Sequence, residues 1–199
     1  MLENLLPPPA TKMTGMHQNE APQLYMFYIG GSAGRSNIEV HDVQFAAVAR
    51  VEDAYPMLRD AWFGDAETLH LDGYTRVGWV DGHDVSLGDA PCGSGLRLFF
   101  VNMGGYQPEQ LAELHEFALF VAADEAAAKA KAKKCLLQGA SLRHKDDLRE
   151  VDNCLALQQI DGLHVQLRPN PHGTPARPEW QGYRPISAAK LARAGRRQS

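Results

Sequence analysis

Cysteine is scarce in this sequence, which has only Cys92, Cys135 and Cys154 among its 199 residues. An odd number, with no two at metal-ligand spacing, argues against a disulfide framework and against a cysteine-based metal site, and favours reduced thiols in a cytosolic protein. We expect Cys92, in a glycine-rich linker, to be the most exposed thiol.

Long apolar runs are also missing. No segment approaches the roughly 20 apolar residues that span a bilayer. The first residues, MLENLLPPPATKM, lack the basic and apolar regions of a secretory signal. We therefore expect a cytoplasmic protein that does not bind membranes.

Sequence signals of nucleotide binding and of nucleophilic catalysis are absent as well. The chain contains no G-x-G-x-x-G, no phosphate-binding loop with its lysine and no G-x-S-x-G. These absences remove the motif-based grounds for a dinucleotide, a nucleoside triphosphate or a serine nucleophile. The residues identify no cofactor and no reaction.

Positive charge is concentrated at one end of a chain whose net charge is −4. Residues 168–199 carry seven basic residues and one acidic residue, a net +6, whereas the remainder carries 13 basic and 23 acidic residues, a net −10. An acidic body is poorly suited to nucleic acid, so we expect at most weak binding through this Pro-rich basic tail. The tail is predicted to be a solubilising disordered extension, with docking of Trp180 and Tyr183 on the body left open.

What the sequence does contain is a repetition of itself. Seven residues recur 74 positions later: Leu24, Gly30, Gly31, Glu39, His41, His70 and Asp72 match Leu98, Gly104, Gly105, Glu113, His115, His144 and Asp146. A further group recurs at an offset of 80, where Asp81-Gly82, Val85 and Leu87 match Asp161-Gly162, Val165 and Leu167. Ordered matches at a nearly constant offset indicate a tandem duplication, with six additional residues near 147–152 in the second copy.

Hydrophobic periodicity predicts the same elements in both copies. The expected strands are 24–29, 39–49, 75–80 and 83–87 in the first copy and 98–103, 113–122, 155–160 and 163–167 in the second. The expected helices are 52–63 and 124–138, each with acidic residues at its start, where they complement the helix dipole. Asp81-Gly82 and Asp161-Gly162 predict two-residue hairpin turns.

This pattern predicts one α+β body. We divide the chain into a disordered leader (1–23), repeat 1 (24–87), a linker (88–96), repeat 2 (97–167) and the tail (168–199). A single strand-strand-helix-strand-strand unit would bury little surface, so the two repeats are expected to share a core. The predicted arrangement is a pseudo-twofold antiparallel sheet with the helices on one face.

Several motifs resemble the bacterial family called domain of unknown function 1543. In the first copy they are the apolar run ending in Gly30-Gly31, the Glu-x-His-Asp at 39–42, Tyr55-Pro56, Trp62-Phe63-Gly64 and Leu69-His70-Leu71-Asp72. In the second copy they are Phe99-Phe100-Val101-Asn102, Gly104-Gly105-Tyr106 and Glu150-Val151-Asp152. The resemblance covers about residues 24–167. It implies one or two domain copies in an uncharacterised bacterial cytosolic protein and carries no assigned activity.

Paired histidines and acids are the candidate site residues. Residues two apart on a strand point to the same side, so Glu39 should project with His41, and Glu113 with His115. His70 and Asp72, mirrored by His144 and Asp146, form a second polar pair. Imidazoles and carboxylates from both copies can hold a first-row metal ion, with Glu39, His41, Glu113 and His115 as the predicted ligands, or act as general acid and base. The alternative is a solvated strand face with cross-strand polar pairs.

The glycine pairs complete the candidate ligand-binding set. Gly30-Gly31 and Gly104-Gly105 close apolar runs, which favours turns with positive φ over close approach of a ligand to the backbone. The aromatic residues Tyr25, Phe27, Tyr28, Trp62 and Trp79 are predicted to be core, with a pocket lining as the alternative.

Two functions of different class remain from the sequence. The favoured hypothesis is a non-enzymatic pseudo-dimeric module that binds a small ligand or a protein partner, as a monomer or homodimer. The alternative is a metal-dependent, hydrolase-like enzyme that uses Glu-x-His pairs from both repeats.

Overall fold

The computed structural model describes residues 21–138 and 149–186. In the first half it contains β1 (Gln23–Gly31), β2 (Val40–Val48), the 3₁₀ turn η1 (Val51–Ala54), α1 (Tyr55–Ala61), β3 (His70–Arg76), β4 (Trp79–Val80) and β5 (His83–Gly88). In the second half it contains β6 (Arg97–Gly105), β7 (Leu114–Ala122), α2 (Glu125–Cys135), β8 (Arg149–Leu157), β9 (Gln159–Ile160), β10 (Leu163–Pro169) and β11 (Trp180–Pro185). Neither helix within these ranges is long and apolar enough to cross a membrane.

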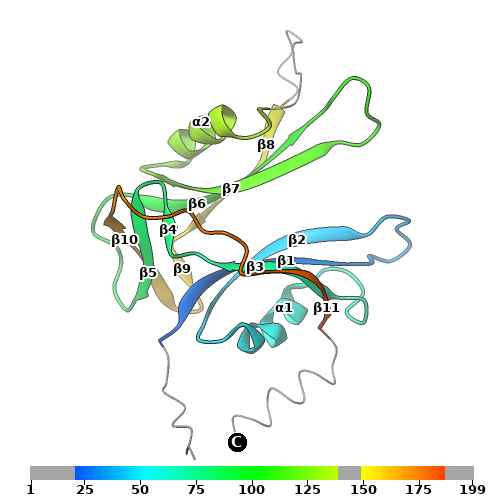
Figure 1. Cartoon of the computed structure of the whole chain (residues 1–199), viewed down its shortest axis with the longest axis horizontal. Helices are drawn as coiled ribbons and strands as arrows, with labels where there is room; N and C mark the ends of the chain where they lie inside the picture. Colours follow the sequence, from blue (N-terminus) through cyan, green and yellow to red (C-terminus); the bar gives the residue numbers. More distant parts are fainter. Residues whose placement is uncertain (1–20, 139–148, 187–199) are drawn as a thin grey trace, which may run out of the picture.

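The strands form three antiparallel sheets rather than one. The first sheet has the order β11-β3-β1-β2, the second β7-β6-β8, and the joining sheet β4-β5-β10-β9. Figure 1 shows the first and second sheets one above the other, with α1 on the outer side of one and α2 on the outer side of the other. The prediction of a single sheet with both helices on one face is therefore wrong, and the fold is mostly antiparallel β with two short helices.

The reason is that β1 and β6 are apolar on both faces. One face of each strand contributes Leu24 and Leu98 to a core shared by all three sheets. The opposite faces contribute Phe27 with α1 on one side and Phe99 with α2 on the other, in separate clusters. A strand buried on both faces needs a layer on each side, which places the helices outside and the sheets against each other.

The joining sheet links the two halves. Its central pair is β5 from the first half and β10 from the second, with Val85 opposite Leu167 and Leu87 opposite Val165. The Asp81-Gly82 and Asp161-Gly162 turns have positive φ at all four residues, as predicted for two-residue hairpins. Each turn reaches the other half, because Asp81 Oδ2 accepts a hydrogen bond from Val121 N (3.1 Å) and Asp161 Oδ2 from Ala47 N (2.8 Å).

These two bonds are reciprocal, since Val121 is 74 positions after Ala47 and Asp161 is 80 positions after Asp81. We expect Asp161→Ala to lower the free energy of unfolding by about 1–2 kcal/mol, since it removes a charge-assisted bond and places alanine at a φ of 49°. Asp161→Asn keeps an acceptor oxygen and tolerates this φ, so its loss should be smaller. Urea unfolding of both variants checks this, and equal stabilities would contradict the expectation.

The glycine pairs are not turns. Gly30 and Gly31 are the last residues of β1, Gly104 and Gly105 are the last residues of β6, and none of the four has a positive φ. The prediction of a turn at these pairs is wrong. Each strand includes its glycine pair. At Gly30 and Gly31 a glycine is needed because neighbouring atoms leave little room for a side chain, not because the backbone adopts a conformation that favours glycine.

Part of the predicted tail is folded. β11 pairs with β3, and Ile186 is buried in the cluster under α1. The Arg184 guanidinium lies 4.2 Å from the Trp180 ring and donates to the Tyr55 hydroxyl, which anchors the strand. The prediction of a disordered extension is thus wrong for this segment, and its alternative, docking of Trp180 and Tyr183 on the body, is what the structure shows. The physical reason is that the segment pairs with the edge of the first sheet and buries apolar side chains in a core. Residues 187–199 and 1–20 lie outside the described part of the chain.

The thiols also differ from expectation. Cys135 is exposed, whereas Cys92 and Cys154 are only partly so. A contact with the Ser94 hydroxyl lowers the pKa of Cys92, whereas burial raises the pKa of Cys154.

Candidate functional site

Two histidines flank one glycine in a row across the first sheet. The register pairs Gly30 with His41 on β2 and with His70 on β3. Residues opposite one another in neighbouring strands project to the same face, so both imidazoles lie over the position where Gly30 has no side chain. A register irregularity at Tyr28/Ile29 leaves Asp72 as an additional residue of β3 next to this row.

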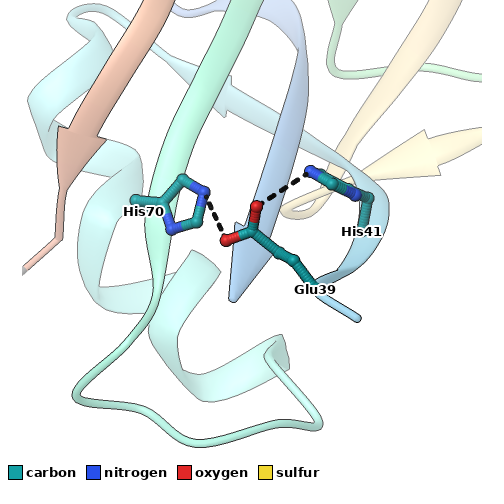
Figure 2. Close-up of side chains that lie close together, drawn as sticks. All are labelled: Glu39, His41 and His70. Atoms are coloured by element: carbon teal, nitrogen blue, oxygen red, sulfur yellow. Dashed lines mark ion pairs between the residues drawn. The ribbon is translucent and has the colours of Figure 1, made fainter. Parts of the chain in front are cut away.

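Two carboxylates lie between the imidazoles. Glu39 contacts His70 through Oε1, 3.1 Å from Nε2, and His41 through Oε2, 3.8 Å from Nε2. Asp72 contacts His41 through Oδ2 at 3.2 Å and His70 through Oδ1 at 3.3 Å. Figure 2 shows the Glu39 carboxylate directed at both rings. Among the described residues, Glu39, His41 and His70 form the one group of three whose potential ligand atoms all lie within 4.8 Å.

The protonation of His70 follows from its other nitrogen. Nδ1 lies 3.0 Å from the Thr68 carbonyl oxygen, which can only accept, so Nδ1 carries the proton. In a neutral ring Nε2 then presents a lone pair, and that atom is buried with no hydrogen-bond partner although two carboxylate oxygens face it at ion-pair distance. Lone pairs directed at one another require a cation between them, either a second proton or a metal ion.

The cluster exists because position 30 is glycine. A β-carbon there would lie 2.8 Å from Asp72 Oδ2, 2.8 Å from His41 Cδ2 and 2.9 Å from His41 Nε2. Real β-carbons do not approach other atoms so closely, so the side chains of Asp72 and His41 would have to move out of their places in the cluster. Gly30 therefore makes room for the carboxylates and imidazoles, which explains a glycine inside a central strand.

Two tyrosines enclose the histidines. The Tyr28 ring stacks on His41 with centroids 5.0 Å apart and planes 3° apart, and the Tyr183 ring of β11 lies 4.2 Å from His70. His70 is consequently only 1% exposed although it lies next to a cleft. Burial, and secondly the charge of Asp72, raise the pKa of Tyr28, so its hydroxyl stays protonated at neutral pH.

The cluster opens on a cleft of about 600 Å³ between the two stacked sheets. Glu39, His41 and Tyr28 line it from the first sheet. The second sheet contributes Phe100, Asn102, His115, Phe117 and Asn153. Both halves of the chain thus form the cleft, and its volume is within the range of roughly 300–1,000 Å³ that is usual for small-molecule sites.

The second half does not reproduce the histidine cluster. Its register pairs Gly104 with His115 and with Glu150, so Glu150 occupies the place that His70 has in the first half. Glu113 lies 3.5 Å from His115, and the structure groups Glu39 and His41 with His70 rather than with these two residues. His144 and Asp146 lie outside the described residues, and the register does not make them the counterparts of His70 and Asp72. The prediction matched these residues at an offset of 74, but the six additional residues precede β8, so the counterparts of β3 residues lie at an offset of 80.

Sequence reasoning missed two residues that support the site. Thr68 supplies the carbonyl for His70, and its hydroxyl donates to the Asp65 carbonyl and accepts from Ser32 N. Tyr183 comes from the predicted tail, for which docking on the body was left open without a partner. A threonine two residues before a histidine has no distinctive signal, and only the pairing of β11 with β3 brings Tyr183 to His70.

Comparison with known proteins agrees with a duplicated domain. The family described as Domain of Unknown Function (DUF1543) matches two segments, residues 36–87 and 110–167. The crystal structure of a protein Il1583 from Idiomarina loihiensis is similar at a TM-score of 0.65 and 31% sequence identity, over 83% of this chain and 99% of that chain. No curated protein sequence matches this one. Because the two matched segments together span more than half of the sequence, the chain belongs to the Domain of Unknown Function (DUF1543) family and carries two copies of the domain.

Proposed function

We propose that this protein binds one divalent first-row transition-metal ion, with Glu39, His41 and His70 as ligands and Asp72 beside them, at the wall of a ligand-binding cleft. The observation that carries the proposal is the buried Nε2 of His70, which faces carboxylate oxygens of Glu39 and Asp72 at 3.1 and 3.3 Å while Nδ1 donates to a backbone carbonyl. A histidine that ligates a metal characteristically donates its second nitrogen in this way.

The spacing of the atoms supports the same reading. Ligand atoms about 2.0–2.1 Å from a tetrahedral ion are roughly 3.3 Å from one another. Within the proposed ligand set, Glu39 lies 3.1 Å from His70 Nε2 and 3.8 Å from His41 Nε2, and the potential ligand atoms of all three residues lie within 4.8 Å of one another. Two imidazoles with one or two carboxylates suit zinc and its neighbours rather than magnesium or calcium, which prefer oxygen ligands.

The test is a zinc titration of the purified, untagged full-length protein, followed by native mass spectrometry and competition with a chromophoric chelator. We expect one zinc ion per chain that survives gel filtration, and much weaker binding of magnesium. If no zinc is retained, the cluster consists of two imidazolium–carboxylate pairs and the metal proposal fails.

Metal-dependent hydrolysis is the second candidate function. Glu39 and His41 line the cleft, so an ion held by three protein ligands would leave a coordination position facing that space. Sites of this kind activate a bound water molecule. Turnover of p-nitrophenyl acetate that depends on bound zinc would favour this candidate over simple ligand binding.

A further inference from the structure

A second, mainly apolar pocket of about 330 Å³ adjoins the candidate metal cluster. Its walls include Met26, Val43, Tyr74, Phe117 and Pro178. It shares Tyr28, Val43 and Phe117 with the larger cleft, so the two spaces are neighbours. Pro178 and Gln181, beside and within β11, close one side of it.

One charged residue lines this pocket among the described residues, and it is Asp72. The same carboxylate contacts both His41 and His70, so the charged end of the pocket is one wall of the metal cluster. A molecule with its apolar part in the pocket therefore has its polar end beside the cluster. Asp72 Oδ2 is buried and lies 3.2 Å from His41 Nε2, so this oxygen belongs to the cluster and not to the apolar part of the pocket.

We infer that the cleft and pocket bind a small carboxylic acid, with its apolar body against Met26, Val43 and Phe117 and its carboxylate on the metal ion. This inference rests on the proposed metal site. A divalent ion held by Glu39, His41 and His70 would offer an open coordination position to the carboxylate, whereas the metal-free cluster presents the carboxylates of Glu39 and Asp72 to it. The acid therefore requires the metal ion.

The pocket's volume sets the size of the ligand. It lies near the lower end of small-molecule sites, which suits a short apolar body rather than a long acyl chain. Each methylene group that is buried in the pocket raises the affinity about fourfold. Affinity should therefore increase from acetate to hexanoate.

Calorimetric titration of the full-length protein, first loaded with zinc and then metal-free, tests the inference with acetate, hexanoate, hexan-1-ol and hexylamine. We expect hexanoate to bind the zinc-loaded protein at least tenfold more tightly than acetate or hexan-1-ol, and to lose at least tenfold when zinc is removed. Equal affinities of hexanoate and hexan-1-ol, or tighter binding of hexylamine, would overturn the inference while the zinc titration still supports the metal site. Failure of zinc binding itself overturns both, and the loading step reveals it.

A substitution in the pocket tests binding of the acid separately from binding of the metal ion. Gln181 is exposed and lines the pocket, so Gln181→Trp narrows it without altering the core. We expect hexanoate affinity to fall at least tenfold and zinc affinity to stay unchanged, with Gln181→Ala as the matched control that leaves the pocket open. Unchanged hexanoate affinity in Gln181→Trp would show that the acid binds elsewhere.

Discussion

Replacing His70 by alanine is expected to weaken zinc binding by at least about 100-fold, because loss of a supporting residue alone costs roughly 10–100-fold and His70 is one of the proposed ligands. The variant removes the buried Nε2 of His70, so the carboxylates of Glu39 and Asp72 both lose their contact with this nitrogen. Chelator competition measures the change directly. His115→Ala is the matched control, since it deletes the histidine 74 positions after His41, outside the proposed ligand set.

Thermal unfolding gives an independent measure of the same effect. A ligand at 100 times its dissociation constant stabilises the folded state by about 2.7 kcal/mol. For a chain of this length that corresponds to a rise in Tm of roughly 5–10 °C. Wild type and His115→Ala should show this rise with zinc and His70→Ala should not. An equal rise in His70→Ala would exclude His70 as a ligand.

Gly30→Ala is expected to have the second largest effect, although it removes no functional group. The new β-carbon would have to displace Asp72 and His41, which it approaches to 2.8 Å. We expect zinc affinity to fall about 10–100-fold, as for other changes that misplace ligands, and the free energy of unfolding to change little, because the displaced atoms are the ends of partly exposed side chains.

Gly78→Ala is the matched control for this variant. A β-carbon at Gly78 has no atom within 4 Å, so the substitution should leave both zinc affinity and stability close to wild type. Chelator competition and urea unfolding on the two variants provide the comparison. Wild-type zinc affinity in folded Gly30→Ala would contradict the assigned role of Gly30.

The elements with strong local signals could be predicted from the sequence. The first strand, the alanine-rich helix and the two Asp-Gly hairpins lie where expected, because a short apolar run, helix capping and positive-φ turns depend on nearby residues. Asp124 illustrates this, since it accepts a hydrogen bond from Ala127 N at the start of α2. The grouping of Glu39 with His41, and of His70 with Asp72, also followed from the period of two in a strand.

The register and the layers could not be predicted in this way. Whether His41 meets His70 or His115 depends on which strands pair through Gly30, and hydrophobic pattern does not choose between these partners. The same pattern cannot distinguish one long sheet from stacked sheets when a strand is apolar on both faces. The glycine pair was predicted to be a turn because the preference of glycine for turns takes no account of side chains from neighbouring strands that lie over it.

By itself, the sequence determined that the chain is duplicated and that each copy ends its first strand in Gly-Gly and begins its second near Glu-x-His. The tertiary structure decided that only the first copy assembles Glu39, His41 and His70 over Gly30, next to a cleft formed by both halves. The physical reason is that these side chains come together only if their strands lie at the right distance and in the right register. Those distances are set by β-sheet register and by the packing of two apolar faces, neither of which is local in the chain.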